Sequence, residues 1–146
     1  MQDSDLATLG ILIVEDEPLL RKQMMADLEK QGADVTGADT LQRAKKLLEN
    51  LGFDFAFLDV NLPDGRGTDL LKENNFPANT GVIVMTAEGA VSGAVEAMRL
   101  GAIDYLVKPF DLAELPLVIA RARRAKQSAR LDEHRRSDES RAGGGF

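Results

Sequence analysis

The sequence predicts an α/β fold, a doubly wound five-stranded parallel sheet with helices on both faces. Five short apolar runs alternate with segments of helical periodicity, as in parallel strands joined by crossover helices. These runs show little alternation of polar and apolar residues, which is typical of strands buried on both faces. At 146 residues and 44% hydrophobic composition, the chain has enough material for one domain with its own core.

The first two strand–helix units occupy roughly the first third of the chain. A β-branched strand at residues 10–14 ends in the carboxylates Glu15 and Asp16. Pro18 suits the first turn of the helix that follows, because its missing N–H has no helical partner there. A weaker strand is expected at residues 33–38, and a second helix at residues 40–52 begins on a threonine cap.

The third strand, residues 53–58, is a continuous apolar run that ends abruptly in Asp59. Pro63 and the glycines that follow it predict a loop over residues 63–67, and a short helix is expected at residues 68–73. A fourth buried strand at residues 81–86 ends in a threonine hydroxyl. The centre of the predicted sheet therefore ends in polar side chains.

A fourth helix is predicted up to residue 100 and a fifth strand at residues 103–107, followed by Lys108. Asp111 and Glu114 have the spacing of a capping arrangement for the last helix. Pro116 falls where that helix would lose a backbone hydrogen bond, so the helix should begin late or kink there.

Charge and composition separate an acidic body from a basic tail. Residues 1–116 contain 10 Lys and Arg against 20 Asp and Glu, whereas residues 117–146 contain 8 against 4. The acidic body argues against nucleic acid as a ligand of the folded domain. We expect a domain over residues 1–125 and a basic helical extension with a flexible linker over residues 126–146. Val118, Ala122, Ala125 and Ala129 offer an alternative, a short helical pair between two chains.

Several classes of protein are excluded by what the sequence lacks. The chain has no cysteine, so it forms neither a disulfide framework nor a thiolate metal site. It has no segment of the kind that exports a protein and no apolar stretch of membrane-spanning length. We therefore expect a cytoplasmic protein with no membrane partner.

The carboxyl ends of parallel strands lie at one edge of a sheet, where α/β domains bind their ligands. That edge collects the side chains that end four of the strands: Glu15, Asp16, Asp59, Thr86 and Lys108. Two unit charges 4 Å apart repel by about 4 kcal/mol at an effective dielectric near 20, so three carboxylates there require a cation. An all-oxygen ligand set favours Mg²⁺ over Ca²⁺ if waters and a phosphoryl oxygen complete it.

Such an edge has the groups that phosphoryl transfer needs. A carboxylate facing Mg²⁺, a lysine and a hydroxyl is equipped to attack phosphorus and hold an acyl phosphate. Taken singly, Asp59 could cap a turn, Thr86 could be an ordinary strand residue and Lys108 a surface cation. Their joint occurrence at the ends of alternating strands favours a site.

The chain resembles the receiver domain of a two-component response regulator over about residues 8–125. The resemblance rests on four motifs: Glu15-Asp16, Leu58–Gly65 (LDVNLPDG), Met85-Thr86-Ala87 and Lys108-Pro109-Phe110. It implies a flavodoxin-like sheet with strand order 2-1-3-4-5. It also implies a signalling protein that is not an enzyme, apart from catalysing its own phosphorylation and dephosphorylation.

The resemblance assigns roles to the acidic residues. It implies that Asp59 accepts phosphate from a sensor histidine kinase. Asp16, Asp59 and the backbone carbonyl of Asn61 would bind Mg²⁺, and Glu15 would hold a metal-bound water.

Phosphate contact and switching fall to three further residues. Thr86 and Lys108 would contact the phosphoryl group, and the Lys108-Pro109 bond would be cis. Tyr105 matches the aromatic residue that turns inward in this family when the threonine moves toward the phosphate. Thr86 and Tyr105 are therefore the predicted switch pair.

The fourth helix, the Tyr105 strand and the last helix should form one continuous face, because consecutive βα units lie side by side. We expect a homodimer through this face, with opposite charges matched across a two-fold axis. The charged residues assigned to the face are Arg99, Arg121, Arg123, Glu96, Asp104 and Glu114.

The output is expected to be transcription regulation through an effector domain missing from this chain, which would supply any contact with nucleic acid. A stand-alone regulator is the alternative. A Mg²⁺-dependent phosphohydrolase that forms an aspartyl phosphate, and a protein-binding domain that is never phosphorylated, are the competing functions.

Overall fold

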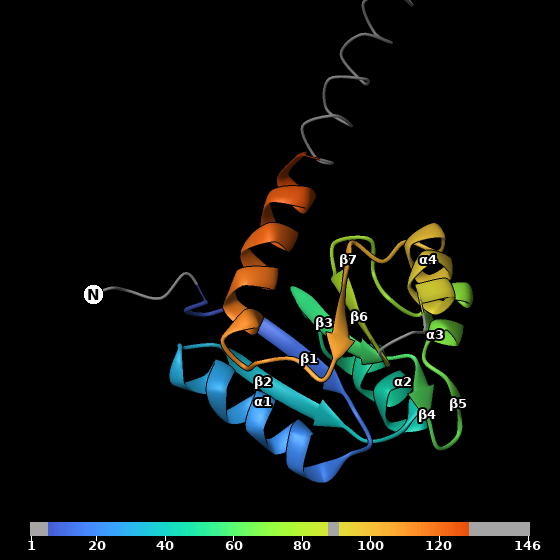
Figure 1. Ribbon diagram of the computed structural model, residues 1–146, viewed down its shortest axis with the longest axis horizontal. Coiled ribbons are helices and arrows are strands. Elements are labelled where there is room, and N and C mark those ends of the chain that lie inside the picture. The colour runs from blue at the N-terminus through green and yellow to red at the C-terminus, as the bar shows by residue number, and fades with distance from the viewer. Residues whose placement is uncertain (1–5, 88–90, 129–146) are drawn as a thin grey trace, which may run out of the picture.

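The computed structural model describes residues 6–87 and 91–128, and a five-stranded parallel sheet forms its centre (Figure 1). The strands lie in the order β2-β1-β3-β6-β7, and each neighbouring pair is parallel. Their bounds are β1 (Gly10–Val14), β2 (Asp34–Ala38), β3 (Phe55–Asp59), β6 (Gly81–Ala87) and β7 (Asp104–Lys108). Counted along the chain, the parallel strands have the order 2-1-3-4-5, so the predicted fold class and strand order are confirmed.

Helices cover both faces of the sheet (Figure 1). They are α1 (Pro18–Lys30), α2 (Leu41–Asn50), α3 (Thr68–Lys72), α4 (Val91–Arg99) and a C-terminal helix that is described over residues 114–128. The C-terminal helix packs beside α1 on one face, and α2, α3 and α4 cover the other. None of the helices in the described ranges has both the length and the apolar character needed to cross a membrane.

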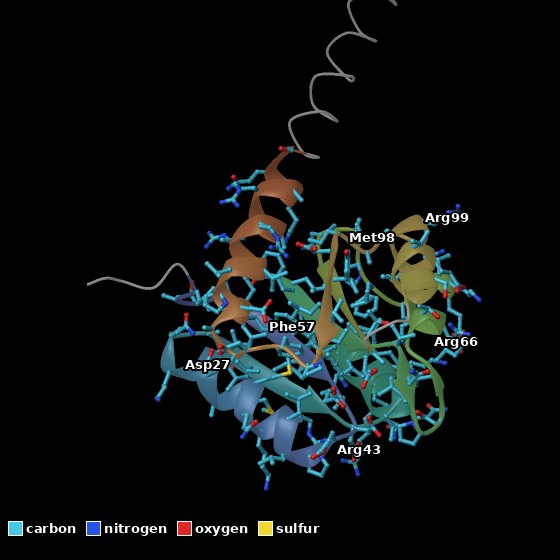
Figure 2. The ribbon with its side chains drawn as sticks, viewed as in Figure 1. Asp27, Arg43, Phe57, Arg66, Met98 and Arg99 are labelled. Carbon is cyan, nitrogen blue, oxygen red and sulfur yellow. The ribbon has the colours of Figure 1, made fainter. Side chains whose placement is uncertain are left out.

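Each face has its own hydrophobic core, because successive side chains of a strand point to opposite sides of the sheet. In β3, Phe55 and Phe57 pack toward α1 and the C-terminal helix, while Ala56 and Leu58 pack toward α2, α3 and α4. Phe57 lies at the centre of the molecule (Figure 2). The continuous apolar run of this strand is therefore explained by burial on both faces, as predicted.

The segment after Asp59 is more ordered than the loop that the sequence predicted. Two short strands, β4 (Asn61–Leu62) and β5 (Gly65–Arg66), pair in antiparallel fashion. Two-residue strands are too short to show a hydrophobic period, so the sequence could not indicate them. The hairpin then turns back at Gly67, whose N–H donates to the carbonyl of Val60 (2.8 Å).

The hairpin also caps α2, from a position far away in the sequence. Both carboxylate oxygens of Asp64 accept backbone hydrogen bonds, from Leu41 (2.9 Å) and Gln42 (3.1 Å). Thr40, the predicted cap, accepts from the N–H of Arg43 (3.1 Å). Desolvation alone would raise the pKa of Asp64, but its backbone hydrogen bonds and the nearby charge of Lys45 together hold that pKa below its usual value.

The C-terminal helix begins late, as Pro116 predicted. The first helical residue is Glu114, so Pro116 lies in the first turn, where its missing N–H costs no helical hydrogen bond. The predicted capping arrangement is confirmed as well. The Asp111 carboxylate accepts from the N–H of Ala113 (3.0 Å), and the N–H of Asp111 donates to the Glu114 carboxylate (2.8 Å).

The predicted helical pair between two chains is wrong for Val118 and Ala122, the first two residues of the predicted contact. Val118 and Ala122 are only 1% and 0% exposed, because they pack into the core beneath the helix. Ala129 and the expected linker up to residue 146 lie outside the described residues. Farther along the helix, the Lys126 ammonium lies 4.7 Å from the centre of the Phe55 ring and donates to the carbonyl of Asp54 (3.1 Å).

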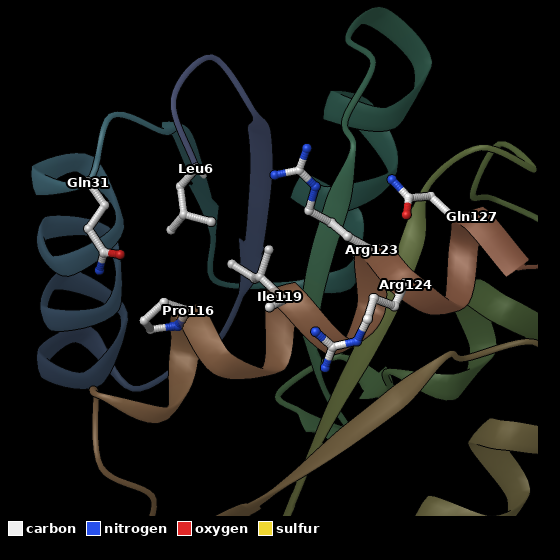
Figure 3. A pocket seen from close by; sticks show the side chains of 8 residues that line it. Leu6, Gln31, Pro116, Ile119, Arg123, Arg124 and Gln127 are labelled. Atoms are coloured by element: carbon white, nitrogen blue, oxygen red, sulfur yellow. The ribbon is translucent and has the colours of Figure 1, made fainter. Parts of the chain in front are cut away.

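Arg123 does not lie on the predicted dimer face. It lines a hollow with Leu6, Gln31 and Arg124, between the N-terminal segment, α1 and the C-terminal helix (Figure 3). The reason is helical geometry, since residues two apart point to nearly opposite sides of a helix. Arg121 lines a different hollow with Asp104 and Tyr105.

Gly67 should be intolerant of any side chain. A Cβ atom there would lie 1.9 Å from the carbonyl oxygen of Asp59, whereas a Cβ at Gly52 would meet nothing within 4 Å. We expect Gly67→Ala to lower the free energy of unfolding by about 3 kcal/mol, at the upper end of overpacking costs. Gly52→Ala, the matched control, should change it by less than about 0.5 kcal/mol. Urea denaturation checks both, and equal effects would contradict the close approach of the backbone.

Candidate functional site

The carboxyl ends of the strands bring three carboxylates together. Glu15, Asp16 and Asp59 each place a carboxylate oxygen within 4.8 Å of the other two. Glu15 is 0% exposed and Asp59 6% exposed, while Asp16 is open to solvent. The convergence predicted from the strand ends is therefore present, with two of its acids buried.

Lys108 joins the two buried acids. Its ammonium donates a short hydrogen bond to Glu15 Oε1 and a second bond of 2.8 Å to Asp59 Oδ2. The Lys108 side chain is 25% exposed, and the carboxylates that it contacts are 0% and 9% exposed. Charged hydrogen bonds of this kind offset part of the cost of burying the acids. The Lys108-Pro109 peptide bond that follows is cis, as the resemblance implied.

Glu15 is fixed by its main chain as well as by its side chain. Its N–H donates to the carbonyl of Ala38 (2.9 Å), and its Oε2 accepts from the N–H of Glu17 (3.0 Å). The guanidinium of Arg21 donates to its carbonyl oxygen (2.8 Å). The sequence reasoning missed Arg21. A signal was available, because a basic residue near a helix N-terminus is unfavourable for the helix dipole and indicates another partner.

Burial and pairing shift the pKa values at this site. Desolvation raises the pKa of Glu15 above its usual value, against the opposing hydrogen bonds from Lys108 and from the N–H of Glu17. For Lys108, burial would lower the pKa, but the hydrogen bonds to Asp59 and Glu15 outweigh it, so its pKa is raised. Lys108 is therefore a cation throughout the physiological range.

Asp59 is held on both of its carboxylate oxygens. Oδ2 accepts from Lys108, and Oδ1 accepts from the backbone N–H of Asn61 (3.0 Å). Asp59 also lies opposite Met85 of β6 in the sheet register. The backbone therefore turns around this carboxylate at the start of β4, with the N–H of Asn61 directed at it.

Thr86 ends the buried part of β6 and is 3% exposed. Gly93 of α4 packs over it, since a methyl group placed there would lie 3.9 Å from Thr86 Oγ1 and 3.8 Å from Val60 Cγ1. Thr86 thus lies between the sheet edge that carries the acids and helix α4.

Tyr105 points outward and is 44% exposed. It belongs to a group of exposed apolar residues on α4, β7 and the C-terminal helix: Val95, Met98, Tyr105, Val107 and Leu117. We call this group the outer apolar patch. Met98 and Arg99 follow one another on α4 (Figure 2).

Several of the charges predicted to pair between two chains are paired within this one. Glu96 of α4 lies 3.8 Å from Arg66 and 3.4 Å from Lys72. Asp104 accepts a hydrogen bond from Arg121 (2.9 Å). These exposed ion pairs contribute little stability, about 0–1 kcal/mol each.

The charges of the acidic site fit a divalent cation. Three carboxylates face a single ammonium, so the cluster carries two negative charges beyond those that Lys108 offsets when all three acids are ionised. All of the acidic donors are oxygens, the ligands that a hard ion such as Mg²⁺ prefers. The exposed position of Asp16 leaves the site open to solvent.

The comparison with protein families gives one match that spans most of the chain. Residues 11–120 match the model of the response regulator receiver domain. Among curated relatives, the regulatory protein AtoC of Escherichia coli is 40% identical over 113 residues, which cover 77% of this chain and 24% of AtoC. The response regulator PilR of Pseudomonas aeruginosa is 37% identical over 117 residues, which cover 79% of this chain and 26% of PilR. The chain thus spans about a quarter of the length of these relatives.

Solved structures agree with the family match. A CheY-like response regulator receiver domain from Methanospirillum hungatei superposes with a TM-score of 0.76 at 27% identity, covering 84% of this chain and 99% of that one. NtrX from Brucella abortus, in complex with ATP, superposes with a TM-score of 0.78 at 28% identity, covering 86% of this chain and 29% of NtrX.

Two substitutions should change metal-free stability in opposite directions. Lys108→Met leaves Glu15 and Asp59 buried without their cation and should lower the free energy of unfolding by about 2–3 kcal/mol, less than for a fully buried pair. Asp16→Asn removes one exposed like charge and should raise it by less than about 1 kcal/mol. Denaturant unfolding in the presence of a chelator measures both. A stabilised Lys108→Met protein would contradict the pairing.

Proposed function

The chain belongs to the response regulator receiver domain family, and we propose that it is a phosphorylation-dependent switch whose phosphoryl acceptor is Asp59. The donor is the phosphohistidine of a sensor histidine kinase. The observation that carries this proposal is the environment of the Asp59 carboxylate, which is 9% exposed on its side chain and bonded to Lys108. A carboxylate with a cation beside it at the end of a strand is placed to attack phosphorus, and the cation can offset charge on the transferred oxygens.

The proposed transfer is a single displacement at phosphorus. A carboxylate oxygen of Asp59 forms a bond to phosphorus while the bond from phosphorus to the imidazole nitrogen breaks. The electron pair of that bond stays on the imidazole, which leaves as the product. Lys108 offsets charge on the transferred oxygens, and the Thr86 hydroxyl donates a hydrogen bond to one of them.

The residues that would hold Mg²⁺ are Asp16, Asp59 and the backbone carbonyl of Asn61, with Glu15 holding a metal-bound water. When bound, the ion would neutralise charge on the phosphoryl oxygens. The support for this assignment is the excess of two negative charges in the cluster and its all-oxygen donors. Glu15 and Lys108 keep this edge of the sheet fixed while phosphate binds, because their hydrogen bonds join β1 to β7.

In the proposed switch, the conformational change begins at the phosphate and reaches the outer apolar patch beside α4. A hydrogen bond from Thr86 to the phosphate draws the hydroxyl away from its place beside Gly93, and Tyr105 moves inward into the space that is left. Phosphate thereby supplies the differential contact that a two-state change requires. About 5.5 kcal/mol of such bias moves an equilibrium from 1:99 to 99:1.

The biological output that we propose is regulation of transcription. AtoC and PilR are named as regulators, and this chain spans only about a quarter of either. KdpE of Escherichia coli, a transcriptional regulatory protein, is 38% identical over 106 residues, which cover 73% of this chain and 47% of KdpE. In the proposed arrangement, an effector domain outside the receiver contacts nucleic acid.

Asp59→Asn should abolish phosphorylation by acetyl phosphate in the presence of Mg²⁺, because the amide is not a nucleophile. Asp54→Asn is the matched control, since Asp54 lies at the opposite end of the same strand and its carboxylate accepts from the N–H of Gly10 (2.8 Å). Intact-mass spectrometry should give one added phosphate on the wild type and on the control. An undiminished adduct on Asp59→Asn would refute the assignment, and continuous release of phosphate from monoesters would favour a phosphohydrolase.

We further propose that the phosphorylated chain forms a homodimer through the outer apolar patch. Of the seven exposed large apolar side chains in the described residues, five lie on these three elements, and apolar side chains gathered on one face mark an interaction site. Asp104 and Arg121 border the patch with a charge of each sign, as a self-complementary contact requires.

Met98→Glu should prevent association when Asp59 carries a beryllofluoride mimic, because it places a charge in the patch. Leu51→Glu is the control, since Leu51 is similarly exposed (49% against 43% for Met98) but follows α2. Sedimentation velocity at high micromolar concentration should give a dimer for the wild type and the control and a monomer for Met98→Glu. A wild type that stays monomeric with the mimic would overturn the dimer while leaving the phosphorylation proposal intact.

A further inference from the structure

We infer that Arg21 is a positioning residue that fixes the direction in which Asp16 leaves the end of β1. This inference rests on the proposed function, in which Asp16 binds Mg²⁺. The proposed role of Arg21 involves no contact with phosphate or metal. It acts on the peptide unit that joins Glu15 to Asp16.

The contact is made to the main chain. Arg21 Nη1 donates to the carbonyl oxygen of Glu15 at 2.8 Å. That carbonyl belongs to the same planar unit as the N–H and Cα of Asp16, so holding its oxygen sets the orientation of the whole plane. The guanidinium thus controls where the Asp16 side chain starts.

The fold makes room for this contact. The Arg21 side chain passes over Gly37 of β2, where an added Cβ would lie 3.3 Å from Arg21 Cδ and 2.8 Å from Met25 Sδ. A residue larger than glycine would push against the stem of Arg21. The absence of a side chain at position 37 therefore lets the guanidinium reach the end of β1 from the first turns of α1.

Asp16 depends on this support more than its neighbours do. Glu15 is held by Lys108, by the N–H of Glu17 and by the carbonyl of Ala38. In the part of the chain that the structure describes, the Asp16 carboxylate has neither a hydrogen bond nor an ion pair. Only its backbone fixes it, and Arg21 holds the adjoining peptide.

Two possible roles of the guanidinium, as a nearby positive charge and as a support for Asp16, predict opposite changes in Mg²⁺ affinity when it is removed. Removing a cation near three carboxylates makes the site more negative, and this alone would tighten the binding of Mg²⁺. Losing the support of a ligand weakens binding, typically 10- to 100-fold when an outer partner of a metal ligand is lost. The sign of the change therefore separates the two roles.

The test compares Arg21→Met with Lys22→Met. Methionine keeps an unbranched apolar stem over Gly37 and lacks the donor. Lys22 is exposed and follows Arg21 in α1, so Lys22→Met removes the same charge from a neighbouring position. We expect isothermal titration with MgCl₂ to give a Kd raised about 10-fold for Arg21→Met and a Kd that is unchanged or lower for Lys22→Met.

A second measurement needs no metal. In a metal-free buffer, Arg21→Met should speed hydrogen exchange at the amide of Glu17, whose N–H donates to the Glu15 side chain, because the turn opens more often. Exchange in the centre of β3 should stay as in the wild type and the Lys22→Met control. A structural role confined to global stability would instead change both.

Arg21→Met protein that binds Mg²⁺ as tightly as the wild type overturns the inference. If that variant does not fold, Arg21→Leu likewise removes the donor and keeps an apolar side chain, and wild-type affinity in that protein overturns the inference instead. A wild type that binds no Mg²⁺ overturns the proposed metal site together with this inference. Wild-type binding with an unaffected Arg21→Met overturns the positioning role alone.

Discussion

The crowding of negative charge at one edge of the sheet is the constraint on which the rest of the structure depends. Two of the three acids are buried, and burial of an unpaired carboxylate costs several kcal/mol. Lys108 offsets that cost only because the register of β7 brings it to the same edge as β1 and β3. The strand order is therefore required for the site, because it brings the lysine to the acids that the lysine stabilises.

The two hydrophobic cores serve this edge in different ways. The core beneath α1 and the C-terminal helix contains large side chains such as Phe55 and Phe57, which fill the space between the sheet and these helices. The other core reaches the site through small residues, with Gly93 over Thr86 and Gly67 against the carbonyl of Asp59. Small residues allow the backbone to approach closely at these two points.

How much the sequence predicted depended on whether its signals were local. Buried strands such as residues 53–58 were predicted because their apolar runs are continuous, and the acids were placed together because parallel strands end at one edge. The capping of α2 by Asp64 was not predicted, since a contact across 23 residues leaves no periodic pattern. Arg123 was assigned to the wrong face because the rotation of the last helix about its axis could not be predicted from its residues. Val118 and Ala122 were assigned to an exposed face of the helix, although a spacing of four residues is equally typical of a face that packs on the core.

The capping of α2 by Asp64 has a consequence for how this domain unfolds. The first turn of α2 takes two of its hydrogen bonds from a carboxylate on the hairpin that follows Asp59. Opening the hairpin leaves those amides unpaired, and fraying of the helix releases the carboxylate, so each event makes the other easier. We therefore expect the β4–β5 hairpin and the first turn of α2 to open together as one cooperative unit. Protection from hydrogen exchange in this part of the chain is a shared property of two segments that are distant in sequence.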